Sequence, residues 1–235
     1  MIRLNLTAEG FSEERFARDI LAPHLVHFNV ALDVRKILTN RKLRKRGGIV
    51  SFQRFHNDIT QWIKEQPGAY HTTFIDLYGL ETDFPNFRET IGREPYDRVS
   101  QIETGIAERI NHRTFIPFVQ LHEYEALLFS NPDIMLEWLS LYKSINSTAF
   151  HAIKQAADGN PELINEGPKT APSKRIISIC DNYDKVDDGI LLLKEIGLDT
   201  IRAECKHFNQ WISRLEKLEE SSASPLTQMA TGDAD

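Results

Sequence analysis

Acidic side chains follow three apolar, strand-like runs in the first half of the chain. Residues 2–7 alternate apolar and polar side chains and lead into Glu9, a run of β-branched and aromatic residues ends at Asp76, and a third run leads into Glu123 and Glu125. Because the carboxyl ends of parallel strands meet at one edge of an open α/β sheet, we expect these acids to gather there. Carboxylates are the hard oxygen ligands that Mg²⁺ prefers.

A further acid, Glu13, lies close to Glu9 in the sequence. Ser12 is a good helix N-cap, and the pattern predicts a helix from about Glu13 to Leu21, stopping before Pro23. The two glutamates then bracket a glycine-containing turn that is suited to holding a divalent cation near a phosphate. The alternative is that an acid in the first turn merely complements the helix dipole.

Phosphodiester hydrolysis by two metal ions requires ions about 3.5–4 Å apart. The candidate ligands for Mg²⁺ or Mn²⁺ are Glu9, Glu13, Asp76, Glu123 and Glu125. Of the last two we expect only one to be a ligand, preferably Glu123, because residues two apart on a helix do not share a face. The candidate catalytic residues are Glu9, Glu13, Asp76 and Lys174.

Lys174 stands beside Ser173 at an expected helix start. There it would neutralise a phosphate or a developing charge, and the helix N-terminus would add N–H donors. A solvated helix start is the alternative. Ser173 and Arg175 are further candidate phosphate contacts.

A basic run precedes two glycines and supplies the remaining candidates for nucleic-acid binding. They are Arg41, Lys42, Arg44, Lys45 and Arg46. Such a loop would grip phosphates without choosing a sequence. It is equally consistent with a solvated loop, or with a surface for an acidic partner.

The composition is that of an ordinary globular protein, with 235 residues, 41% hydrophobic and 26% charged. Two cysteines provide neither a disulfide framework nor a zinc set, and no run has membrane-spanning length or the pattern of a signal peptide, so we expect a cytoplasmic protein without a membrane partner. The formal charge of −6 argues against coating nucleic acid through the bulk field, but not against a local basic groove.

Strand and helix signals alternate up to residue 125 and become almost wholly helical afterwards. This predicts an α/β fold, in which a mainly parallel sheet is flanked by helices and a helical C-terminal half packs against it. We expect a core of residues 1–125, a helical part of residues 126–219 and a disordered acidic tail at 220–235. The chain contains no P-loop, so it is not itself a P-loop ATPase.

The segment Ala8-Glu9-Gly10-Phe11-Ser12-Glu13-Glu14-Arg15-Phe16 resembles the opening motif of Toprim domains, the metal-binding modules of topoisomerases, primases and overcoming-lysogenization-defect nucleases. Longer motifs resemble the bacterial family known as domain of unknown function 4276, as far as about Leu218. They are Asp76-Leu77-Tyr78-Gly79-Leu80, Thr82-Asp83-Phe84-Pro85, Leu121-His122-Glu123-Tyr124-Glu125-Ala126-Leu127-Leu128-Phe129 and Ala171-Pro172-Ser173-Lys174-Arg175.

The resemblance implies a Toprim-like fold and a Mg²⁺- or Mn²⁺-dependent nuclease that acts on DNA or RNA. It further implies an effector of anti-phage defence, encoded beside an ATPase of the ABC or SMC type. Glu9 matches the first Toprim acid, a metal ligand and general base, and Glu13 matches the second acid of the lysogenization-defect nucleases. Asp76 matches the first aspartate of the Asp-x-Asp motif, whose second position is Tyr78 here.

The missing aspartate puts a full two-metal site in question, with Glu81, Asp83 or the pair Glu123 and Glu125 as replacements. Two hypotheses follow from this departure. One is an active nuclease, and the other is a non-catalytic, Toprim-like regulatory or partner-binding subunit. A homo-oligomer stays open in either case.

Overall fold

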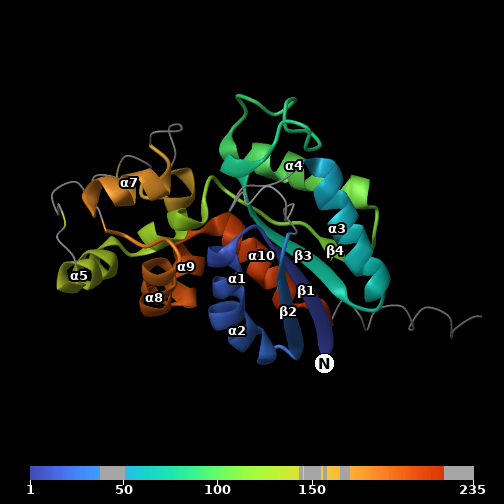
Figure 1. The fold of residues 1–235 in the computed structure, drawn as a ribbon, viewed down its shortest axis with the longest axis horizontal. Coiled ribbons are helices and arrows are strands. Elements are labelled where there is room, and N and C mark those ends of the chain that lie inside the picture. The colour runs from blue at the N-terminus through green and yellow to red at the C-terminus, as the bar shows by residue number, and fades with distance from the viewer. Residues whose placement is uncertain are drawn as a thin grey trace, which may run out of the picture.

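A parallel β-sheet forms the centre of the computed structural model, which describes residues 1–37, 51–142, 145, 155, 158–164, 170–180 and 182–219 (Figure 1). The strand order is β2-β1-β3-β4, with β5 also paired to β3, and every pair is parallel. The strands are β1 (Ile2–Ala8), β2 (Val30–Lys36), β3 (Tyr70–Asp76), β4 (Phe115–Ile116) and β5 (Val119–Gln120). The predicted mainly parallel α/β sheet is confirmed.

The helical connection between β1 and β2 is longer than expected. It consists of α1 (Phe11–Phe16), a π-helical turn η1 (Ala17–Leu21) and α2 (Ala22–Val26), so the predicted stop before Pro23 is wrong. The N–H of Ala22 donates to the carbonyl of Ala17, five residues earlier, which shifts the hydrogen-bond register. Pro23 then occupies the first turn of α2, where its missing N–H costs little.

One face of the sheet is covered by α1, α2 and the last helix, α10 (Lys206–Glu216), as Figure 1 shows. Trp211 of α10 stacks on Phe118 with ring centroids 4.1 Å apart, and its indole N–H donates to Thr72 of β3 at 2.9 Å. Phe208 packs on Phe74 of β3. The C-terminal half therefore packs against the sheet, as predicted.

Two amphipathic helices, α3 (Phe52–Glu65) and α4 (Pro95–Ile110), cover the other face. The apolar stripe of α3 lies in this second core, which includes Phe55 and Ile59 of α3 and Ile102 and Ile106 of α4. Between β3 and α4 the chain forms a short helix η2 (Leu77–Gly79) and a long run of turns.

Beyond β5 the described chain is helical. Its elements are η3 (Tyr124–Ser130), α5 (Pro132–Tyr142), η5 (Pro161–Leu163), α7 (Pro172–Ile179), α8 (Asp187–Ile196), α9 (Leu198–Glu204) and α10. The sequence patterns did not predict α8 and α9. No helix in the described part of the chain is long and apolar enough to cross a membrane. The basic run at 41–46 and the tail at 220–235 lie outside the described residues, so those predictions stay predictions.

The packing predicts that Trp211 anchors the C-terminal half. Trp211→Ala should lower the free energy of unfolding by about 3–5 kcal/mol, because it leaves a cavity beneath α10 and removes the hydrogen bond that the indole donates to Thr72. Urea unfolding measures the change. Leu141→Ala, at a side chain that is 71% exposed, is the control and should change stability by less than about 0.5 kcal/mol.

Candidate carboxylate site

The register of β1 and β3 brings Glu9 and Asp76 together. Ala8 pairs with Phe74, and the N–H of Glu9 continues the ladder by donating to the Phe74 carbonyl at 3.0 Å. The side chain of Glu9 then reaches across the end of β3, where its Oε2 accepts the N–H of Asp76 at 2.8 Å. The two acids therefore stand side by side at the carboxyl edge of the sheet, as the sequence predicts.

Gly79 makes room for the Glu9 carboxylate. A Cβ atom at this position would lie 3.0 Å from Oε1 of Glu9, closer than ordinary van der Waals contact. The turn after β3 thus comes near the acid only because residue 79 lacks a side chain.

Glu13 enters the same site from the first turn of α1 and is buried, with 4% of its surface exposed. Its Oε2 accepts the N–H of Gly10 at 2.9 Å, one half of a capping box. Helix capping and membership of the acidic group are therefore compatible, because the cap uses one of the two carboxylate oxygens.

Asp76 is tied to the next loop as well. Its Oδ1 accepts the N–H of Tyr124 at 2.9 Å, and the N–H of Tyr78 donates to the carbonyl of His122 at 2.9 Å. These bonds hold the chain after β3 against the chain after β5. Tyr78, at the position of the second motif aspartate, has a side chain that is 44% exposed.

Glu123 and Glu125 both reach this region. Glu123 precedes η3 in an extended conformation and its Oε2 accepts the N–H of Ser173, at the start of α7, at 3.0 Å. Glu125 is fully buried, and its Oε2 lies 2.9 Å from the ammonium of Lys185. The expectation that the two acids diverge assumed that both lie within one helix, but Glu123 precedes the helix. Whether either acid binds a cation stays a prediction.

We refer to Glu9, Glu13, Asp76, Glu123 and Glu125 as the carboxylate cluster. Burial, reinforced by the charge of Glu13, raises the pKa of Glu9 to about 7. Burial also raises the pKa of Glu125 to about 7, although Lys185 opposes the shift. The pKa of Glu13 is raised and that of Asp76 is raised well above its usual value, in both cases mainly by burial. Burial, reinforced by mutual repulsion, therefore disfavours the charged forms of these acids.

Lys185 is the one site residue that sequence reasoning missed. Burial opposes its charged form, but Glu125, Asp76 and Glu13 outweigh this effect and raise its pKa. The loop that carries it is fixed by Asp184, whose Oδ1 accepts the N–H groups of Val186 and Asp187 at 2.9 and 2.7 Å. The only local signal is a lysine among acids in 184–188, which is also the pattern of a solvated loop.

The other predicted cations are not brought to the acids in the same way. Lys174 is exposed on α7, and Arg175 donates through Nε to the carbonyl of Thr170 at 2.7 Å. Ser173 contributes its backbone N–H to Glu123, so the N-terminus of α7 does reach the cluster. These roles stay predictions.

In four acids of the cluster, one carboxylate oxygen accepts a hydrogen bond from a backbone N–H and the other does not. Glu9, Glu13, Asp76 and Glu123 each place one oxygen on a backbone N–H, and their second oxygens form no hydrogen bond with another described residue. Among the described residues, no three His, Cys, Asp or Glu side chains are already arranged as a metal site. The donor set, oxygen only and anionic, is of the kind that Mg²⁺ or Mn²⁺ prefers.

A family model described as domain of unknown function 4276 (DUF4276) matches residues 8–216, from the residue before Glu9 to the end of α10. No curated protein and no solved structure matches the chain.

The raised pKa values predict a pH-dependent stability. A glutamate with a pKa of 4.5 in the unfolded chain and about 7 in the folded one keeps its proton longer when folded, so stability falls as the pH rises from about 4.5 to about 7. Glu9→Gln, which mimics the protonated acid, should therefore gain stability relative to the unsubstituted protein by about 2 kcal/mol between about pH 5 and about pH 8.

Urea unfolding in EDTA at the two pH values measures this difference. Glu108→Gln, at an exposed acid of α4, serves as the control and should show no pH-dependent gain. If both variants behaved alike, Glu9 would not be a strained, buried carboxylate.

Proposed function

The chain belongs to the family described as domain of unknown function 4276, and within this family we propose that it is a Mg²⁺- or Mn²⁺-dependent nuclease. The observation that carries the proposal is the carboxylate cluster itself. Acids from the ends of β1 and β3, from α1 and from the start of η3 lie together, with Glu9 partly buried and the others buried, although desolvation and, to a smaller extent, mutual repulsion raise the pKa values of several of them. A cation at this position would remove that cost.

Glu9, Glu13 and Asp76 would hold the cation through the oxygens that the backbone leaves unused, with Glu123 as a further ligand. Bound there, a divalent cation supplies an activated water and charge for the leaving oxygen of a phosphodiester. Glu123 or Glu125, from the neighbouring loop, would compensate for the missing second aspartate at Tyr78.

The chain's own groups would perform the remaining tasks. Glu9 stands at the end of β1 beside Asp76, where its carboxylate would accept a proton from the water that the cation holds. Lys185 remains charged, and 43% of its side chain is exposed, so it can pair with a substrate phosphate at the rim of the cluster. The N-terminus of α7 lies beside Glu123 and adds positive potential.

The resemblance to Toprim domains and to families encoded beside ATPases supports a wider proposal. In it, the protein is the effector of an anti-phage defence system, acts on DNA or RNA, and is controlled by an ATPase partner. The basic run at 41–46 would supply additional phosphate contacts, independent of sequence.

A non-catalytic, partner-binding subunit is the second candidate. Two observations favour it, namely Tyr78 at the position of an expected ligand and the ion pair of Lys185 with Glu125, which already places one positive charge inside the cluster. In that case Lys185 would be a permanent counterion rather than a group that meets substrate.

Cation binding is tested separately from catalysis. Mg²⁺ or Mn²⁺ should raise the melting temperature at about pH 8, and at a hundred times the dissociation constant the gain in stability should be about 2.7 kcal/mol. Glu9→Gln and Asp76→Asn should lose most of this gain, while Glu108→Gln should keep it. A gain of equal size in all four proteins would show that the cations bind elsewhere.

Cleavage is tested with the purified protein, alone and with its encoded ATPase partner, against single- and double-stranded DNA, RNA and transfer RNA in Mg²⁺ or Mn²⁺. Glu9→Ala should abolish cleavage, because removing one ligand disorders the metal that positions the water. Lys185→Ala should lower the rate about a hundredfold or more, whereas Lys174→Ala should have a small effect.

Arg44→Ala combined with Lys45→Ala should instead weaken substrate binding and flatten its salt dependence. Melting curves of each variant separate lost activity from lost folding. If Glu9→Ala and Asp76→Ala retained every activity, the nuclease proposal would be wrong and the chain would be a binding subunit.

A further inference from the structure

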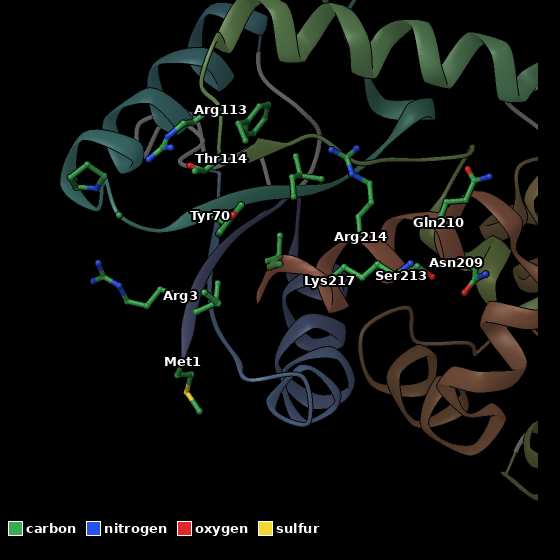
Figure 2. A pocket seen from close by; sticks show the side chains of 16 residues that line it. Met1, Arg3, Tyr70, Arg113, Thr114, Asn209, Gln210, Ser213, Arg214 and Lys217 are labelled. Atoms are coloured by element: carbon green, nitrogen blue, oxygen red, sulfur yellow. The ribbon is translucent and has the colours of Figure 1, made fainter. Parts of the chain in front are cut away.

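A cavity lies at the end of the sheet opposite to the carboxylate cluster. It has a volume of about 1110 Å³ and is bounded by the N-terminal ends of β1, β3 and β4 on one side and by α10 on the other (Figure 2). The cluster lies at the carboxyl ends of the same strands. The cavity is therefore separate from the proposed nuclease site.

Its charge is positive. Arg3, Arg113, Arg214 and Lys217 line the cavity, and no acidic residue does. Within the described chain the guanidinium groups of Arg3, Arg113 and Arg214 form no hydrogen bond or ion pair. In a protein with a formal charge of −6, three exposed arginines that line one cavity and have no partner among the described residues favour an anionic occupant.

Nearby acids do not cancel this charge. Glu216, on the turn of α10 between Arg214 and Lys217, is directed to other partners: its Oε2 accepts from Arg202 at 3.0 Å and its Oε1 lies 2.7 Å from Nε2 of His24. It therefore contacts Arg202 and His24 rather than the residues that line the cavity.

The floor of the cavity is apolar and aromatic. Ile2, Tyr70, Phe115, Ile116 and Leu218 line it, and the polar side chains of Gln210 and Ser213 stand beside Arg214 on α10. Figure 2 shows Tyr70 on the strand side, across the cavity from Ser213 and Arg214 on α10. A cationic rim around an apolar, aromatic floor fits a ligand that combines phosphates with a flat ring system.

From this geometry we propose that the cavity binds a nucleotide, with its phosphates at the arginine-lined rim and its base against Tyr70. The volume is sufficient, since pockets for molecules of this size measure about 300–1,000 Å³. α10 packs directly on β3, and Asp76 is the last residue of that strand. A ligand between α10 and the amino ends of the strands would therefore contact β3 at the end opposite to Asp76.

The test is calorimetric titration of the full chain, in EDTA, with ATP, inorganic triphosphate and adenosine as probes. ATP should bind saturably, and more tightly than either fragment. Arg113→Ala with Arg214→Ala should weaken ATP and triphosphate binding about tenfold or more, because each guanidinium donates charge-assisted hydrogen bonds to phosphate. Arg54→Ala, at an exposed arginine of α3 that does not line the cavity, should bind ATP normally.

Tyr70→Leu separates the two halves of the site: it should weaken ATP binding but leave triphosphate binding unchanged. Glu9→Gln should bind ATP normally, so this proposal stands or fails independently of the nuclease proposal. Absence of ATP binding at millimolar concentration, or equal ATP affinity in the double-arginine variant, would overturn it. The nucleotide proposal would also be overturned if a single-stranded oligonucleotide bound at these arginines and ATP failed to displace it. Melting curves confirm that each variant is folded.

Discussion

The rest of the site depends on how a parallel sheet can bury several carboxylates at one edge. An ionised acid that leaves water without compensation costs several kcal/mol, so it needs donors or a counter-charge. The structure supplies backbone N–H groups: Asp76 donates to Glu9, Tyr124 to Asp76, Gly10 to Glu13 and Ser173 to Glu123. These bonds connect the ends of β1 and β3 to η3 and α7. The acids are thus both the candidate chemistry and the links between the segments.

Partial compensation explains the electrostatics of the cluster. One neutral N–H donor per acid stabilises its charge only in part, and Lys185 provides a single ammonium, placed against Glu125. The pKa values of Glu9 and Glu125 consequently rise to about 7. A cation that displaced the protons of these groups would be bound more tightly as the pH rises. The raised pKa values thus favour a cation at this edge of the sheet.

The two ends of the sheet differ in charge, although the net charge of −6 shows only the acidic excess. The carboxyl ends of β1 and β3 hold the carboxylate cluster, and their amino ends open into the cavity lined by Arg3, Arg113 and Arg214. α10 packs on β3 between these two ends, because Trp211 stacks on Phe118 and donates its indole N–H to Thr72 of β3. An anionic ligand at the basic end and a cation at the acidic end would therefore contact the same sheet.

The sequence by itself determined the α/β class and the strands that lead into Glu9 and Asp76, because these follow from the spacing of apolar residues and from parallel-strand geometry. It also placed α7 beside the site, through motifs that resemble the family now shown by the match over residues 8–216. Only the tertiary structure decided that Lys185 meets Glu125, 60 residues away by their numbers, and that Glu123 and Glu125 both face the cluster. It likewise decided that a π-helical turn carries the helix past Pro23. Periodicity reports which side of its own element a residue occupies, whereas ion pairs across loops and shifts of helix register depend on packing between distant segments, which no local pattern records.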